Sequence, residues 1–76
     1  MTKAKVLLQS ISDVKEFVSA VSLCDFDVDL ISGRYAVDAK SIMGIFSLDL
    51  TNAIELVAHT DDSEALFAQI SKFVVK

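Results

Sequence analysis

Proline is absent from this chain of 76 residues, which has only two glycines, one cysteine and one histidine. Having so few breaking residues predicts regular secondary structure joined by short turns. A single cysteine excludes a disulfide within the chain and favours a reducing, cytoplasmic setting. A lone histidine with no cysteine partner nearby cannot build a metal site.

Basic residues are also scarce, seven against eleven acidic ones, for a net charge of −4. This balance argues against a nucleic-acid binder, which needs a basic face, and against a polybasic module for membrane surfaces. No apolar run reaches the roughly 18 residues expected of a membrane span. Hydrophobic residues are abundant, at 53%. They suffice for one modest core, so we expect a single domain over residues 1–76.

Apolar periodicity gives the order of elements. Loose alternation over 3–9 predicts a strand, and apolar residues spaced i, i+3, i+4 and i+7 from Val14 predict a helix over about 12–23. Strands are expected at 25–30, 34–38 and 53–59, with a turn at Ser32-Gly33 and helices at about 41–49 and from 61 onward. The order β-α-β-β-α-β-α predicts an α+β fold of two layers, with the helices covering one face of the sheet.

Acidic and apolar residues alternate along the second strand, where Asp25, Asp27 and Asp29 interleave with Phe26, Val28 and Leu30. Three aspartates on one face suggest a metal site as one reading. However, same-face neighbours lie about 7 Å apart on a strand, too far for all three to bind one cation. A solvated acidic face is the favoured interpretation.

The run from Val37 to Leu48 is the most informative stretch. Ser41 precedes a short apolar helix, where a serine is a good N-cap and where the helix dipole also favours an anion. Ser41 is therefore a structural cap, a phosphorylation site, or both. The apolar residues cover nearly the whole helix, so some must face solvent or a partner. Met43 and Phe46 are the best candidates, and Gly44 suggests close approach of another element or chain.

This chain resembles the HPr family, the histidine-containing phosphocarrier proteins of the bacterial sugar phosphotransferase system. The resemblance is carried by Asp27-Val-Asp-Leu30 and by Val37-Asp-Ala-Lys-Ser-Ile-Met-Gly-Ile-Phe-Ser-Leu48. It implies an open-faced sandwich, a four-stranded antiparallel sheet with three helices on one side. It also implies protein partners, which in this family include HPr kinase, a transcriptional regulator and phosphotransferase components.

The family's catalytic motif is missing. HPr proteins carry Gly-Leu/Ile-His-Ala-Arg-Pro-Ala at the start of the first helix, where the histidine accepts a phosphoryl group from Enzyme I. Counted back without gaps from Ser41, the histidine position falls on Ser10 and the arginine position on Ser12. A serine hydroxyl needs an activating base that neutral imidazole does not need. The only histidine, His59, is expected to be a partly exposed residue at a strand end, the alternative being a relocated phosphoryl acceptor.

Ser41 falls on the position that HPr kinase phosphorylates in low-GC Gram-positive bacteria. The resemblance therefore implies a regulatory protein that is not an enzyme, binds no cofactor and exists as a monomer or weak dimer. The expected contact residues are Lys40, Ile42, Met43, Phe46 and Leu48. Two alternatives stay open: a working phosphocarrier, or a small binding domain unrelated to sugar transport. Cys24 is expected to be a small buried residue at the end of the first helix rather than a reactive thiol.

Overall fold

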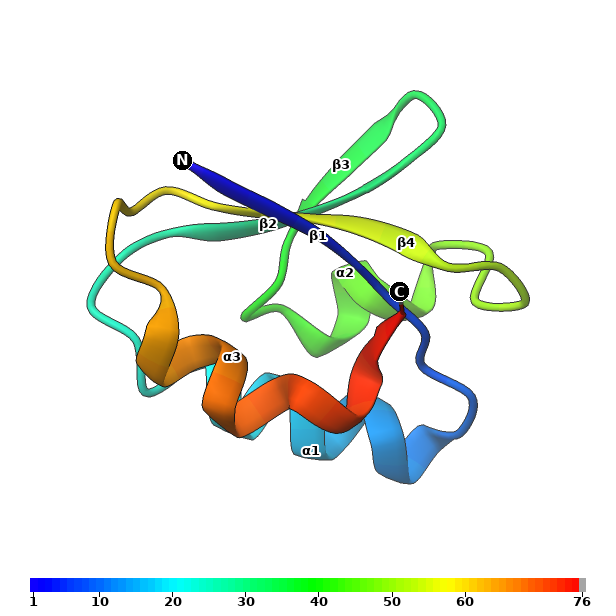
Figure 1. Ribbon diagram of the computed structural model, residues 1–76. Coiled ribbons are helices and arrows are strands. Elements are labelled where there is room, and N and C mark those ends of the chain that lie inside the picture. The colour runs from blue at the N-terminus through cyan, green and yellow to red at the C-terminus, as the bar shows by residue number, and fades with distance from the viewer. Residues whose placement is uncertain (76) are drawn as a thin grey trace.

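A computed structural model describes residues 1–75 and shows a sheet with three α-helices on one side (Figure 1). The strands are β1 (Thr2–Val6), β2 (Val28–Ser32), β3 (Tyr35–Asp38), β4 (Ile54–Ala58) and β5 (Val74–Val75). The helices are α1 (Ile11–Val21), α2 (Ile42–Phe46) and α3 (Glu64–Ile70), followed by a 3₁₀ turn (Ser71–Phe73). The α+β fold and its two layers are confirmed.

The sheet has five strands in the order β3-β2-β4-β1-β5, and all neighbouring strands are antiparallel. The prediction of four strands is corrected by β5, because Val74 was assigned to the last helix. That helix ends at Ile70, and Val74 pairs with Val6 while Val75 pairs with Lys5. Two β-branched residues favour extended backbone, and they cover an edge of β1 that would otherwise be unpaired.

The core lies between the two layers and follows the predicted periodicities. Val14, Phe17 and Val21 of α1 are buried, as are Val28 and Leu30 of β2. The Phe17 and Phe73 rings meet edge to face with centroids 6.0 Å apart, an arrangement that favours aromatic pairs beyond their area burial. This contact fixes the chain leaving α3 against α1. Within residues 1–75, no helix has the length and apolar character needed to cross a membrane.

The connection into β2 differs from the predicted strand at 25–30. The β2 ladder begins at Val28, which pairs with Ala58, the last residue of β4. Because β4 ends there, no strand lies beside Asp25 and Phe26, and these residues belong to the loop. At the other end of β2, the turn to β3 matches the prediction. Gly33 has φ 60°, a conformation that residues with a side chain rarely adopt.

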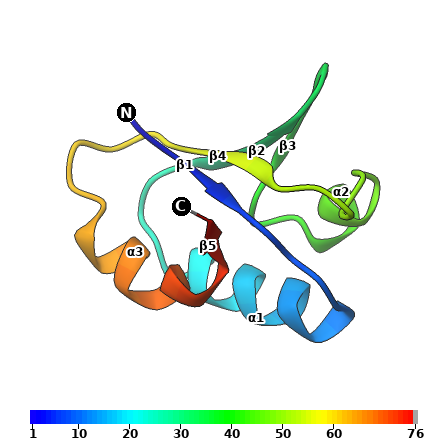
Figure 2. The same cartoon turned by 45° about the vertical axis from the view of Figure 1, so that its right-hand side comes forward.

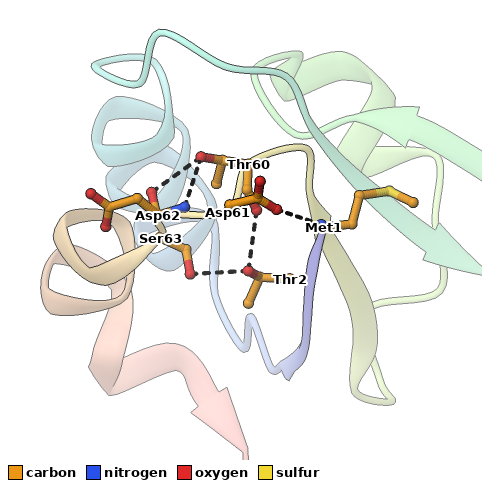
Figure 3. Close-up of polar contacts among 6 residues, drawn as sticks. All are labelled: Met1, Thr2, Thr60, Asp61, Asp62 and Ser63. Carbon is orange, nitrogen blue, oxygen red and sulfur yellow. Dashed lines mark hydrogen bonds and ion pairs between the residues drawn. The ribbon is translucent and has the colours of Figure 1, made fainter.

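Two regions of the sheet–helix sandwich matter for function. Figure 2 shows α2 at the end of the molecule where β1 runs into α1. At the opposite end, the loop from β4 into α3 is tied to the N-terminus (Figure 3). Ser63 Oγ donates to Thr2 Oγ1 over 3.2 Å, and the Met1 amine lies 3.5 Å from a carboxylate oxygen of Asp61.

Candidate interaction site

The α2 helix begins with the serine cap that its sequence predicts. Ser41 has extended backbone angles, and its Oγ accepts a hydrogen bond from Gly44 N over 3.2 Å. At the other end, Ser47 Oγ donates to Gly44 O over 2.6 Å. The cap is confirmed, and because Ser41 is exposed, its hydroxyl is open to solvent. Phosphorylation of Ser41 stays a prediction.

The apolar residues of α2 divide between surface and core. Met43 is 76% exposed and Phe46 is 41% exposed, whereas Ile45 is fully buried and Ile42 packs partly against the core. Leu48 was predicted among the contact residues. It is only 8% exposed, so it supports the helix from below and offers almost no surface to a partner. The α2 patch, defined as Met43 and Phe46, is thus a pair of exposed apolar side chains on a helix that Ile45 and Leu48 anchor in the core.

Lys40 is held by contacts within the chain. Its backbone N–H donates to Asp38 Oδ1 over 2.9 Å, and its ammonium donates to the carbonyl oxygen of Cys24 over 3.0 Å. That carbonyl follows the end of α1, whose last turn contains no basic residue. The Lys40 ammonium therefore supplies a positive charge where the helix dipole is negative. Lys40 thus makes a structural contact within the chain, which uses one of the three donors of its ammonium.

The thiol of Cys24 is partly buried, in agreement with the predicted small packed residue. Burial raises the pKa of this thiol above its ordinary value, Lys40 opposes the increase, and Asp25 adds to it. A raised pKa keeps the sulfur protonated near neutral pH and reduces its nucleophilicity.

Gly44 explains how closely α2 approaches the sheet. A Cβ placed on Gly44 would lie 3.3 Å from Val37 Cβ and 3.3 Å from Ser41 Oγ. The close approach suggested by the sequence is therefore to β3 and to the cap itself. A larger residue would press on the hydroxyl whose modification is predicted.

The first turn of α1 is closed by its own side chains. Ser10 Oγ accepts a hydrogen bond from Asp13 N over 3.1 Å, and the Asp13 carboxylate accepts one from Gln9 N over 3.0 Å. This pattern is a variant of the capping box: Asp13 lies three residues after the cap, and its carboxylate bonds the amide of Gln9, one residue before the cap, instead of the amide of Ser10. The box uses two free amides and places a negative charge at the helix N-terminus. Ser12 lies exposed on the same turn.

An open groove of about 510 Å³ joins this turn to α2. It brings Ser10 and Phe46 together, whereas Lys40, Ser41 and Met43 lie outside it. The sequence reasoning missed Ile11, which lines the groove and is 63% exposed. Its position was the available signal: an isoleucine in the first turn of a helix, outside the apolar face that begins at Val14, indicates exposed apolar surface. The groove is lined by Leu7, Leu8, Gln9, Ser10, Ile11, Phe46, Leu50 and Thr51.

His59 lies elsewhere. It follows the last residue of β4 and is partly exposed, as predicted, and its Nε2 lies 2.8 Å from Asp29 Oδ2. Because Thr2 pairs with Ala58, His59 is beside the start of β1, whereas Ser10 follows its end. Of the three aspartates weighed as a metal site, Asp29 thus contacts a histidine. Residues 1–75 contain no group of three histidine, cysteine or acidic side chains placed to hold a metal ion.

Comparison with known proteins gives a family match and several matches to solved structures. The family described as "PTS HPr component phosphorylation site" matches residues 12–76, a region that begins two residues after Ser10. The crystal structure of HPr-C-His from Thermoanaerobacter tengcongensis superposes with a TM-score of 0.80 at 25% identity. The superposition covers 95% of this chain and 89% of that one. None of the curated proteins searched matches the chain.

Proposed function

The chain belongs to the HPr family of phosphotransferase-system proteins, and we propose that it acts there as a regulatory interaction protein without phosphoryl-carrier activity. Its contacts would be made by the α2 patch and the adjoining groove, and its state would be set at Ser41. The expected setting is the cytoplasm, with protein partners drawn from the phosphotransferase system or from the regulators that read it.

The capping box of α1 is the observation that carries this proposal. A phosphoryl acceptor at the start of a helix depends on free amides and positive charge to hold the transferred group. Here Ser10 Oγ occupies the Asp13 amide, and the Asp13 carboxylate occupies the Gln9 amide. On the family pattern, Asp13 takes the place of the proline and Ser12 that of the arginine. An incoming phosphoryl group would therefore find a neutral serine in place of the guanidinium, with the Asp13 carboxylate beside it in place of the proline.

Among residues 1–75, neither His59 nor Cys24 offers a substitute. His59 lies across the length of β1 from Ser10, and its Nε2 is directed at Asp29. A neighbouring carboxylate disfavours a dianionic phosphoryl group by like-charge repulsion. The Cys24 thiol is kept protonated by its raised pKa. Neither residue is therefore suited to accept a phosphoryl group, and these observations favour binding over phosphoryl transfer.

The α2 region suits regulated docking. Met43 and Phe46 present apolar surface, and the groove extends that surface toward Ile11. A phosphate on Ser41 would add about −1.5 to −2 charge two residues before Met43, at the N-terminal end of the helix that presents this surface. The first turn of α2 contains no acidic residue that would repel the phosphate. Modification would therefore change the charge of the docking surface while the fold is retained.

Phosphorylation is tested by incubating the chain with HPr kinase and ATP beside a bona fide HPr protein. We expect one phosphate on the wild type and none on Ser41→Ala. Ser47→Ala is the matched control, because Ser47 is an exposed serine that caps the other end of the same short helix, and it should be labelled normally. An unlabelled wild type, under conditions that label the HPr control, would remove the regulatory part of the proposal.

Docking is tested separately, with the phosphorylated and unphosphorylated chain against Enzyme I and the catabolite repressor. We expect Met43→Ser and Phe46→Ser to weaken whichever complex forms, since each removes exposed apolar surface without opening the core. Tyr35→Ser is the matched control for Met43→Ser, because Tyr35 has nearly the same exposure and lies on the β2–β3 hairpin outside the α2 patch and the groove. A complex weakened by Tyr35→Ser and not by the α2 variants would place the contact elsewhere.

A further inference from the structure

A second groove lies at the C-terminal end of α1, whereas the first lies at its N-terminal end, and the two grooves share no lining residue. It has a volume of about 280 Å³, between the end of α1 and the start of α3. Its apolar lining includes Leu23, Cys24, Phe26 and Leu66. Leu23 is 80% exposed, a large solvent exposure for an aliphatic side chain. The volume falls below the range usual for cofactor or drug-sized ligands, so the groove suits the side chains of another protein.

Acidic residues lie on or next to the two segments that line this groove. Asp25 lines it, Asp27 follows in the same loop, and Asp62 and Glu64 precede the α3 residues that line its other wall. Figures 1 and 2 both place the 22–27 and 60–64 segments side by side at this end. Within residues 1–75, these four carboxylates make no ion pair, whereas neighbouring Asp61 pairs with the Met1 amine. The rim therefore carries an excess of negative charge, and among the residues described the one cation bonded to a lining residue is the Lys40 ammonium, on the carbonyl oxygen of Cys24.

The acidic wall is held in place before any partner arrives. Figure 3 shows the loop in which Thr60 Oγ1 accepts from Asp62 N over 3.1 Å and donates to Asp62 O over 3.2 Å. Ser63 is bonded to Thr2. These contacts fix the 60–63 loop against β1, so binding there would lose little conformational freedom.

We propose that this second groove docks a basic, amphipathic segment of a partner protein, with an apolar side chain against Leu23 and lysine or arginine residues facing the acidic rim. Opposite charge on the rim steers association and selects the partner, while the apolar contact supplies most of the affinity. The same charge repels nucleic acids and anionic membranes. This surface is independent of the α2 patch, so the chain could hold two partners at once.

A second copy of the chain does not supply such a segment. Among residues 1–75, Lys3 and Lys5 lie on β1, Arg34 lies at the β2–β3 turn, and Lys72 pairs with Glu16. Lys40 is bonded to Cys24. Lys15 shares a face of α1 with the exposed Ile11, but it is a single basic residue between Asp13 and Glu16 and does not make a basic segment. None of the other basic residues named shares a helix face with an exposed large apolar side chain.

The test uses the whole chain and three synthetic peptides: a helical lysine–leucine peptide, its glutamate-for-lysine counterpart and its serine-for-leucine counterpart. Calorimetry measures affinity at low and high salt, and iodoacetamide measures protection of Cys24, which lines the groove and is the only cysteine. We expect only the lysine–leucine peptide to bind, more weakly at high salt, and to slow alkylation. Leu23→Ser should weaken binding about tenfold, and Glu64→Gln about two- to fivefold.

Met43→Ser is the matched control, since Met43 has nearly the same exposure on the other surface. It should leave peptide affinity unchanged, and circular dichroism should show both serine variants folded. Absence of binding, equal binding of the acidic peptide, or binding lost in Met43→Ser and kept in Leu23→Ser would each overturn the proposal. So would self-association of the chain in sedimentation equilibrium that Leu23→Ser abolishes, because a second copy would then cover the groove.

Discussion

Replacing Ser10 with alanine removes the hydroxyl that closes the first turn of α1. The Asp13 amide then loses an acceptor held at 3.1 Å, and losses of this kind cost about 1 kcal/mol. For a domain of this size, that corresponds to a melting temperature lower by roughly 4–8 °C. Because Ser10 is exposed, no cavity adds to the cost. The full effect should therefore come from the cap.

Urea unfolding followed by far-ultraviolet circular dichroism measures this loss as a shift in midpoint at constant slope. Ser12→Ala is the matched control: Ser12 is an exposed serine on the same turn, and within residues 1–75 its side chain makes no hydrogen bond. It should change the free energy of unfolding by less than about 0.5 kcal/mol. Ser10→Asp should retain stability, since aspartate caps as well as serine. Equal effects of Ser10→Ala and Ser12→Ala would refute the capping box and the argument built on it.

Three further perturbations follow from single contacts. Lys40→Met removes the cation that opposes the raised pKa of Cys24, so the alkylation profile of that thiol should move to higher pH. Gly33→Ala forces a side chain into φ 60° and should cost about 1–2 kcal/mol in thermal unfolding, with normal stability contradicting the turn geometry. Hydrogen bonds from Thr51 lower the pKa of Asp49. Its stabilisation is thus present above the ordinary carboxyl pKa and lost as pH falls through the lowered one. The stability gap between wild type and Asp49→Asn should accordingly close on acidification.

Sequence patterns predicted the features that depend on local periodicity. The spacing from Val14 to Val21 defines the buried face of α1, and Ser41 caps α2 because its hydroxyl can accept a hydrogen bond from an amide of the first turn. Gly33 marks the hairpin for an equally local reason, its positive φ. Each of these depends on residues within one turn of helix or one β-turn.

Contacts between distant segments escaped the same reasoning. The β5 strand exists because β1 has a free edge, which the two valines alone do not reveal. The burial of Leu48 and the bond from Lys40 to Cys24 depend on how α2 sits on the sheet and beside α1. The capping box is different: the spacing of Ser10 and Asp13 predicts it, and only the functional consequence of the carboxylate required the structure.

Phosphoryl transfer from phosphoenolpyruvate and Enzyme I tests the central proposal most directly. The wild-type chain is incubated beside a bona fide HPr protein and beside a variant that rebuilds the family motif with Ser10→His, Ser12→Arg and Asp13→Pro. The account predicts acid-labile phosphate on the HPr control and on the rebuilt variant, and none on the wild type. Acid-labile phosphate on the wild-type chain would contradict it.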